Sequence, residues 1–389
     1  METQWQEFAK KEISRCSGRF QDLGNRNEYA EQHFKNLFTQ AMVSIRDRLK
    51  EDGIAAIYFA HTSFSAWALL LEAMREAGFM MTGAFPVATE SKDRVTARGK
   101  MTMDTSIVIV CRQNPEPKEG LLKEVLPEIQ QFAERYAKTL SKKEIPGRDV
   151  LIGTMIGAII PVMKYSKILS PSGELSMDKM LEEHVYPIVG KVLSETYGGI
   201  QKGKESLNSP YSLFYLLAKI AFGGKSGTNP FTSDDVVTLC RASKLGIDSA
   251  RELIIEEKEK RTGEESEEGE RGSKVASSKT FRLAELSSKE PLKIKSFLLS
   301  RRISPDSAVV KLRNPIDAYH LLLYYTAAYD DNRIRALFRN LREQWAGEVD
   351  EAYKLLKIVS KMKNGVEAEL AKKFLQAVEE GGGGLVAWV

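Results

Sequence analysis

A histidine and a threonine follow a short apolar segment, at a position where α/β proteins bind ligands. Residues 54–60 (Ile-Ala-Ala-Ile-Tyr-Phe-Ala) come after Asp52-Gly53 and predict a buried parallel strand. His61 and Thr62 then stand at the carboxyl end of that strand, the end where open α/β sheets bind ligands. We predict that both residues lie at the edge of a pocket. A capping or structural role for His61 is the more common alternative.

A second candidate site is a cationic stretch within residues 89–100. Lys92, Arg94, Arg98 and Lys100 place four positive charges in nine residues, between two segments that predict strands. Lysine and arginine side chains bind the phosphates of nucleic acids. We therefore predict nucleic-acid contact here, although an ordinary solvated loop between two strands accounts for the charges equally well.

Two further segments look like catalytic or phosphate-binding motifs. Enzymes that methylate an exocyclic amine use Asn or Asp followed by Pro-Pro and an aromatic residue. The Asn or Asp side chain and a backbone carbonyl accept hydrogen bonds from the amine, and the aromatic ring stacks on the base. Asn208-Ser-Pro-Tyr211 has Ser in place of the first proline and comes before a helical pattern, so it predicts the start of a helix. Gly223-Gly-Lys-Ser-Gly227 follows a helix and lacks the first glycine of a phosphate loop, so it predicts an ordinary loop. We assign no catalytic or cofactor-binding residue.

Composition excludes several classes of protein. The 57 basic and 53 acidic residues give a net charge of +4, too small to indicate nucleic-acid binding by itself. The three cysteines (Cys16, Cys111 and Cys240) form no C-x-x-C pair and the four histidines are scattered, so no metal site is predicted. The N-terminus is polar, and no apolar run approaches the length of about 18 residues that predicts a membrane span. We expect a cytoplasmic protein that contacts no membrane.

The periodicity of apolar residues divides the chain into an α/β part and a helical part. A helix over 26–50 leads to the strand at 54–60, a helix over 63–77, and strands at 79–88 and 105–111. The remaining pattern is helical apart from a charged stretch at 256–279, which predicts a mobile loop. The predicted helices cover 118–140, 147–163, 176–196, 210–222, 232–242, 292–300, 314–327, 333–345, 348–362 and 366–378.

The predicted domains follow from these changes of pattern. Residues 1–116 form a partial α/β unit, because Asn114-Pro-Glu-Pro117 breaks the chain after the last strand. Residues 117–255 and 291–380 predict two helical domains, and the charged flexible loop spans 256–290 between them. Residues 381–389 are a glycine-rich tail.

The quoted residues carry a resemblance to a known family. Tyr58-Phe-Ala-His-Thr62, Trp67, residues 72–79 and Ile107-Val-Ile-Val-Cys-Arg112 resemble the later part of large prokaryotic adenine-specific DNA methylase-like proteins. The resemblance continues as a diffuse pattern over most of residues 30–378, including the Gly-x-x-x-Gly segment within 149–168. One strand, one helix and then a strand pair is how a class I methyltransferase sheet finishes.

The resemblance implies a truncated, Rossmann-type class I methyltransferase sheet followed by a mainly helical region, an α/β plus all-α fold. The family's glycine-rich cofactor turn and its Asn-Pro-Pro-aromatic loop have no counterpart here. We therefore expect the C-terminal portion or a subunit of an S-adenosylmethionine-dependent adenine-specific DNA methyltransferase, inactive alone. A separate chain with the N-terminal methylase half would supply the cofactor, and DNA is a possible partner. The alternative is a non-catalytic helical interaction, regulatory or DNA-binding protein derived from such a methylase.

Overall fold

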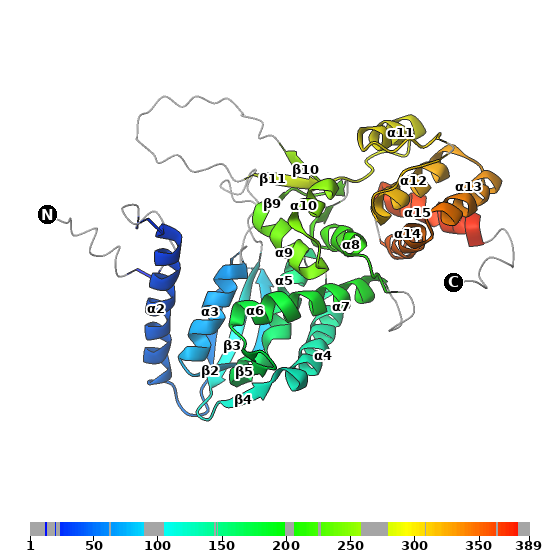
Figure 1. Cartoon of the computed structure of the whole chain (residues 1–389). Helices are drawn as coiled ribbons and strands as arrows, with labels where there is room; N and C mark the ends of the chain where they lie inside the picture. Colours follow the sequence, from blue (N-terminus) through cyan, green and yellow to red (C-terminus); the bar gives the residue numbers. More distant parts are fainter. Residues whose placement is uncertain are drawn as a thin grey trace, which may run out of the picture. The chain divides into compact units, whose positions relative to one another are not determined.

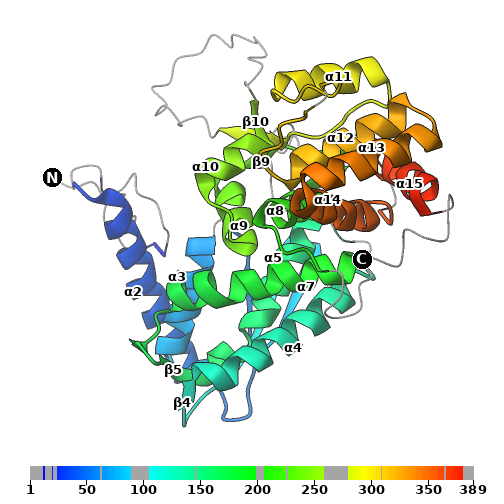
Figure 2. The same ribbon diagram turned by 45° about the vertical axis from the view of Figure 1, so that its right-hand side comes forward.

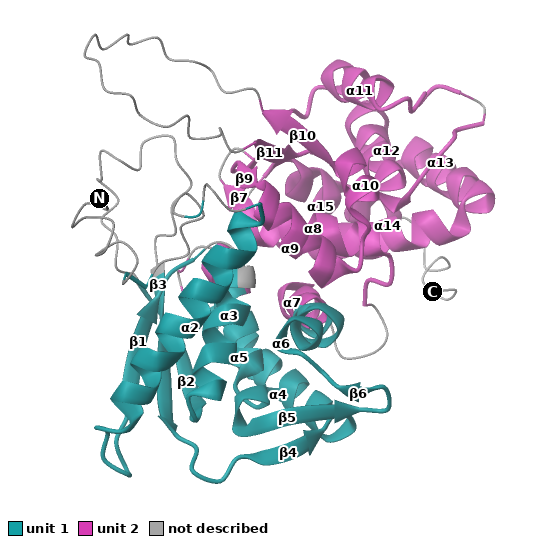
Figure 3. Cartoon of the chain, turned by 60° about the vertical axis from the view of Figure 1, so that its left-hand side comes forward, with its two compact units in different colours: residues 1–140, 152–189 teal, residues 141–151, 190–389 magenta. Residues whose placement is uncertain are grey.

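The computed structural model divides the chain into two compact units. It describes residues 12–13, 20, 24–61, 64–88, 105–143, 145, 147–198, 206–224, 227–257, 279–307, 309–362 and 365–379. Unit 1 comprises residues 1–140 and 152–189, and unit 2 comprises residues 141–151 and 190–389 (Figure 3). The division falls within two helices, α5 (Gly147–Ile159) and α7 (Tyr186–Gly198). The fold is mixed α/β, with small sheets and a large helical part.

Unit 1 contains a three-stranded sheet with the order β1-β3-β2. The elements are β1 (Ala55–Phe59), α3 (Phe64–Glu76), β2 (Phe79–Ala88) and β3 (Thr105–Gln113). The prediction of three strands with a helix after the first is confirmed. β3 lies between β1 and β2 and is antiparallel to both, so β1 and β2 run parallel to each other.

The prediction that the first segment is a buried parallel strand is wrong in two respects. β1 has β3 as its hydrogen-bonded neighbour, and that pairing is antiparallel. Its residues alternate between half-buried and exposed, with Tyr58 66% exposed. The apolar run suggested burial on both faces. The strand instead lies at the sheet edge, and no described strand pairs with its other side.

One face of this sheet is covered and the other displays apolar side chains. Ile107 and Ile109 of β3 are fully buried on the covered face, beside which α2 (Arg26–Arg46) and α3 pack against each other (Figure 1). On the opposite face Tyr58, Val108 and Phe85 form a row across the three strands, because Val108 pairs with both aromatic residues. The two aromatic residues at the ends of that row are exposed, Phe85 by 55%.

At the edge of β2 that faces away from β3, a backbone N–H is hydrogen-bonded to a side chain. The backbone N–H of Ala84 donates to the hydroxyl of Tyr136 at 3.1 Å, and Pro86 has no N–H to offer. Tyr136 belongs to α4 (Leu122–Leu140) and reaches this position beside Gly157 of α5. A Cβ at residue 157 would lie 2.2 Å from Cγ of the tyrosine ring, so only glycine leaves the ring where it is.

The rest of unit 1 differs in part from the predicted helices. The segment predicted as a helix from residue 118 begins with a strand, β4 (Lys118–Leu121), which pairs in parallel with β5 (Tyr165–Ser170). β5 in turn pairs with β6 (Gly173–Glu174). The short helical segment Val162–Lys164 joins α5 to β5, and α6 (Met177–Lys179) and the π-helix Met180–Val185 connect β6 to α7. Because β4 and β5 pair, residues 117–140 and 152–189 group with the first unit rather than with a domain that begins at 117.

Unit 2 is built around helices (Figure 2). α12 (Pro315–Ala328) is its central helix: every residue from Ile316 to Thr326 is buried, and it packs against α8, α11, α13, α14 and α15. A helix that is buried all round needs neighbours on every side. The helices around it are α8 (Pro210–Phe222), α11 (Pro291–Ser300), α13 (Asp331–Gln344), α14 (Ala346–Val359) and α15 (Val366–Glu379).

Two smaller sheets complete unit 2. β10 (Ile254–Glu257), β11 (Thr280–Leu283) and β9 (Phe231–Thr232) form one, and β7 (Gly223–Gly224) and β8 (Gly227–Thr228) form the other. α9 (Ser233–Ser243), α10 (Ile247–Ala250) and the turn Arg251–Leu253 lie between β9 and β10.

The predicted loop over 256–290 is therefore too long at both ends. Residues 256–257 and 280–283 are paired strands, and Ala284 and Leu286 are buried. These strands could not be predicted from the sequence, because charged residues such as Glu256 and Arg282 interrupt the alternation of apolar and polar residues that indicates a strand. Residues 258–278 and the predicted tail 381–389 lie outside the described residues.

Candidate functional site

His61 lies immediately beyond the end of β1, as predicted, among aromatic side chains. Its imidazole stacks on Phe59, with ring centroids 6.2 Å apart and an interplanar angle of 15°. Its backbone carbonyl accepts a hydrogen bond of 3.0 Å from Nε1 of Trp67, a fully buried residue of α3. Phe59 also meets Trp67 edge to face, at 4.7 Å. These contacts fix the chain where β1 turns into α3.

The described contacts of His61 are two aromatic rings and the hydrogen bond from Trp67 to its own carbonyl oxygen. Its predicted role at the edge of a pocket remains a prediction. The other predicted site residues, Thr62, Lys92, Arg94, Arg98 and Lys100, lie outside the described residues, so their pocket and nucleic-acid roles remain predictions.

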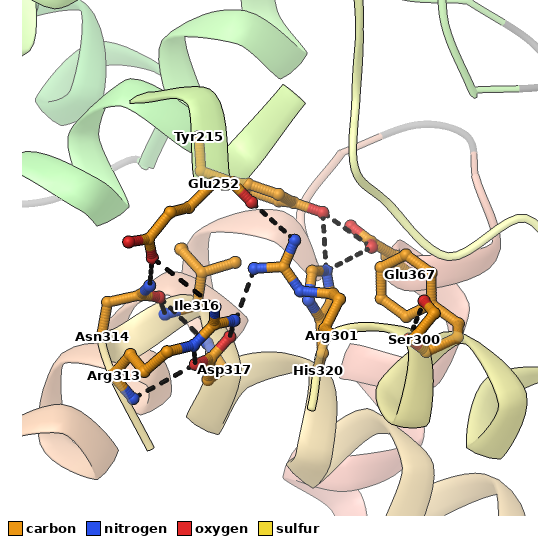
Figure 4. A network of polar contacts seen from close by, with 11 residues as sticks. Tyr215, Glu252, Ser300, Arg301, Arg313, Asn314, Ile316, Asp317, His320 and Glu367 are labelled. Carbon is orange, nitrogen blue, oxygen red and sulfur yellow. Dashed lines mark hydrogen bonds and ion pairs between the residues drawn. The ribbon is translucent and has the colours of Figure 1, made fainter. Parts of the chain in front are cut away.

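The most elaborate polar arrangement in the described chain is inside unit 2, around Glu367 of α15 (Figure 4). Its carboxylate accepts hydrogen bonds from the hydroxyls of Tyr215 (2.8 Å) and Tyr319 (3.0 Å) and from the backbone N–H of Leu286 (2.8 Å). It also pairs with the ammonium of Lys219 at 2.9 Å. We call these residues, with His320, the Glu367 cluster.

The Glu367 cluster joins four segments that are far apart in the sequence. Tyr215 and Lys219 come from α8, Tyr319 and His320 from α12, Leu286 from the segment after β11, and Glu367 from α15. Lys219 also pairs with Glu285 at 2.6 Å. If the helices moved apart, these buried polar groups would lose their partners. The cluster therefore favours one arrangement of the helices.

Charge and burial set the ionisation of the cluster. Burial alone would raise the pKa of Glu367, but the Lys219 ammonium, the His320 ring and the Leu286 N–H hold that pKa well below its usual range. Burial, followed by the nearby Glu367 carboxylate, raises the pKa values of Tyr215 and Tyr319 well above 10, so both hydroxyls stay protonated as donors. Burial lowers the pKa of Lys219, but the two carboxylates beside it raise that pKa by more.

His320 is held as the neutral imidazole. Burial lowers its pKa below 6.5, and the neighbouring Glu367 carboxylate only partly opposes this. Geometry agrees: Nε2 lies 3.0 Å from the Tyr215 hydroxyl and 3.3 Å from Glu367, whereas the buried Nδ1 has no hydrogen-bond partner among the described residues. Protonation would place a second N–H on Nδ1, where no described acceptor meets it.

This arrangement leads to a prediction about pH. The unfolded His320 takes up a proton near pH 6.5 but the folded one does not, so unfolding becomes easier as the pH falls from about 7 to about 5. Glu367 adds a second loss below about pH 4.5, because its folded pKa is depressed. Urea midpoints measured across this range should fall between about pH 7 and pH 5 in the natural chain, and should fall less steeply in His320→Gln. Equal slopes in the two proteins would contradict the assignment.

A second ionic group lies beside the first, around Asp317 (Figure 4). Its carboxylate is fully buried and accepts from Arg301 at 3.2 Å and from the Arg313 guanidinium at 3.0 and 3.2 Å. Arg301 is 9% exposed and also donates to the backbone carbonyl of Glu252 at 2.7 Å. Asn314 caps α12 by accepting from the N–H groups of Ile316 and Asp317, as the sequence Asn314-Pro315 predicts for a helix start.

The Glu367 cluster is closed to solvent. The side chains of His320 and Tyr319 are fully buried, and those of Glu367 and Tyr215 are 1% exposed or less. A general acid or base must come within hydrogen-bond distance of the group it serves, so this burial favours a structural role. In the group around Asp317, Arg313 (43% exposed) and Glu252 (39%) reach solvent. The sequence does carry a signal for the two groups: Lys219, Asp317 and His320 stand inside otherwise apolar helices, where ionisable groups need partners.

Of the two segments that look like catalytic or phosphate-binding motifs, the first begins a helix as predicted, whereas the second was predicted as a loop and forms paired strands at both ends. Ser209 is the N-cap of α8, with Pro210 in its first turn, and Glu351 of α14 accepts from the N–H groups of Asn208 and Ser209. The glycine-containing segment 223–227 begins and ends in the short strands β7 and β8. Asn208 is thus engaged through its backbone in holding the start of a helix.

The described residues contain no group of three or more potential metal ligands. Burial raises the pKa of Cys111 to about 12 and that of Cys240 to about 11, so both free thiols stay protonated and unreactive. Within the described parts of the chain, every helix is too short or too polar to cross a lipid bilayer.

Comparisons with models of protein families, with curated proteins and with solved structures gave no match to this chain. The resemblance to adenine-specific methylases therefore stands on the quoted residues alone and remains a prediction.

Proposed function

We propose that this chain is the C-terminal portion, or a completing subunit, of an S-adenosylmethionine-dependent adenine-specific DNA methyltransferase. Alone it is inactive. A partner chain brings the cofactor-binding half of the sheet and the Asn-Pro-Pro-aromatic loop, neither of which occurs in these 389 residues. This chain contributes the end of the sheet and its helices.

The observation that carries the proposal is the unpaired edge of β1. In an antiparallel pair, alternate N–H and C=O groups of a strand point away from the neighbour. Among the described residues no strand receives those groups of β1. Uncovered edges of this kind are templates for another strand, and proteins normally protect them with charge, proline or a covering element. β1 has none of these protections in its own sequence, Ala-Ala-Ile-Tyr-Phe.

Exposed side chains on one face of the same sheet support the same partner. Ile54 (57% exposed) and Tyr58 (66%) project from the end and middle of the β1 region, and Phe85 (55%) continues the row across the sheet. Apolar surface gathered in this way is typical of an interaction site rather than of scattered surface residues. The element order of strand, helix and strand pair is the one expected at the end of a class I methyltransferase sheet.

The test is reconstitution with a second polypeptide encoded next to this one that carries a glycine-rich turn and an Asn-Pro-Pro-aromatic loop. We expect no binding of labelled S-adenosylmethionine by this chain alone, and methyl transfer to DNA only from the mixture. Tyr58→Glu should weaken the complex about tenfold or more, because it buries a charge at the contact. Leu292→Glu is the matched control: Leu292 is 78% exposed on α11, and this variant should assemble normally.

Each outcome bears on a separate part of the proposal. Binding of S-adenosylmethionine by this chain alone would contradict the missing cofactor half. A complex that forms equally well with Tyr58→Glu would exclude the β1 edge as the contact, whatever the activity of the mixture.

A non-catalytic helical interaction protein is the second candidate, and the closed interior of unit 2 favours it. The ionisable groups that could act as catalysts there are buried and mutually paired. If DNA is its partner, the affinity should fall steeply with salt, because counterions are released from the phosphates. A salt-independent affinity would exclude DNA binding of this kind.

A further inference from the structure

Unit 2 contains a cleft that neither buried cluster uses. It has a volume of about 330 Å³ and lies between the C-terminal end of α12, one face of α13 and the residues that precede α12. Small-molecule sites occupy about 300–1,000 Å³. The cleft is therefore large enough for one small ligand and too small for a folded partner.

The cleft has a mainly polar lining that also includes buried apolar side chains and two tyrosine rings. Val310 and Leu341 are buried, and Tyr325 is 3% exposed. The half-buried Tyr329 lies at the opening, with its ring centroid 6.2 Å from that of Tyr325. Burial, together with the neighbouring tyrosines, raises the pKa of Tyr325 to about 12, so its hydroxyl stays neutral and does not repel an anion. A flat, partly apolar ligand suits these walls.

Arg333 supplies the positive charge of the cleft. It is exposed on α13, and its guanidinium has no ion-pair partner among the described residues. Two other arginines of the same helix are engaged: Arg335 donates to the carbonyl of Ala377, and Arg342 pairs with Asp350. An unpaired guanidinium at the rim of a cleft is suited to bidentate binding of a phosphate.

Two amides on the same face of α13 present a donor and an acceptor. Gln344 donates from Nε2 to Oδ1 of Asn340, one helical turn earlier. That bond leaves Nδ2 of Asn340 and Oε1 of Gln344 available side by side. A donor next to an acceptor complements the edge of a nucleobase, which carries an amino group beside a ring nitrogen. Asp306, the acidic residue of the rim, is already paired with Lys295.

We propose that this cleft binds a mononucleotide, with the base against Tyr329, its edge on the amides of Asn340 and Gln344, and its phosphate on Arg333. The proposal does not depend on the methyltransferase assignment, since all the groups belong to unit 2. Arg333, Asn340 and Gln344 follow each other at helical intervals along one face of α13, so all three side chains project from the same side of the helix.

Calorimetric titration of the full chain with adenosine 5′-monophosphate, adenosine and ribose 5-phosphate tests the proposal. The nucleotide should bind about tenfold or more tighter than either fragment, because each fragment lacks one of the two contacts. Arg333→Gln should lower the affinity for the nucleotide about tenfold and leave that for adenosine unchanged. Arg339→Gln, an exposed arginine on another face of the same helix, should change neither.

Several results would overturn the proposal. These are no saturable binding of the nucleotide, ribose 5-phosphate binding as tightly as the nucleotide, or equal losses in the Arg333 and Arg339 variants. Both arginines are exposed, so unchanged thermal midpoints are expected and a loss of binding would not report misfolding.

Discussion

Replacement of Glu367 by alanine should lower the free energy of unfolding of unit 2 by about 3–5 kcal/mol, the usual cost of removing one partner from a buried ion pair. The change leaves the Lys219 ammonium with Glu285 as its remaining carboxylate partner. It also leaves the hydroxyls of Tyr215 and Tyr319 and the N–H of Leu286 without their acceptor. Urea denaturation measures the loss, and amide hydrogen exchange locates it in α8, α12 and α15.

The matched control for this result lies two residues further along the same helix. Glu369 is 60% exposed and pairs with Lys289 at the surface, so Glu369→Ala should cost less than about 1 kcal/mol. Glu367→Gln should fall between the two, because it keeps the shape and one acceptor but loses the charge opposite Lys219. Similar losses for Glu367→Ala and Glu369→Ala would refute the central role of the Glu367 cluster.

Replacement of Asp317 by alanine should have a comparable effect, about 3–5 kcal/mol, for a different reason. It leaves Arg301, 9% exposed, as a buried cation whose Nε already lacks a partner among the described residues. Arg313 is 43% exposed and can turn its guanidinium to water, so Arg313→Ala should cost only about 1 kcal/mol.

A double-mutant cycle measures the coupling between Arg301 and Asp317. Removing Arg301 together with Asp317 should cost much less than the sum of the single changes, because no uncompensated charge then remains inside. Additive losses would mean that the two side chains are not coupled. Denaturant midpoints of the four proteins are the measurement.

In unit 1, the elements with a clear periodicity of apolar side chains were predicted correctly. Residues 79–88 form β2 as predicted, and the helix of residues 63–77 is found as α3, ending at Gly78 with φ 82°. The direction and burial of β1 were wrong, because an apolar run does not reveal whether both faces of a strand are covered. β4 and β10 were missed, because four-residue strands that contain charged residues depend on their partners rather than on their own pattern.

The clusters of unit 2 could be anticipated only in part. The predicted helix over 314–327 is found as α12, and its apolar pattern indicates the burial that Tyr319 and His320 show. Their partner Glu367 is about 50 residues away in the sequence, in a helix whose polar face also carries ordinary solvated acids such as Glu369. A single sequence does not distinguish those two glutamates, because the difference arises only when α8, α12 and α15 pack together.

The hydroxyl of Tyr136 on the backbone of β2 has a consequence for stoichiometry. A sheet whose two edge strands can both pair with another chain can add copies indefinitely and grow into a filament. In the β1-β3-β2 sheet, the outer edge of β2 has Ala84 bonded to that hydroxyl and Pro86 without an N–H, which leaves β1 as the more receptive edge. Association through this sheet should therefore stop after a single step and yield a discrete pair of chains.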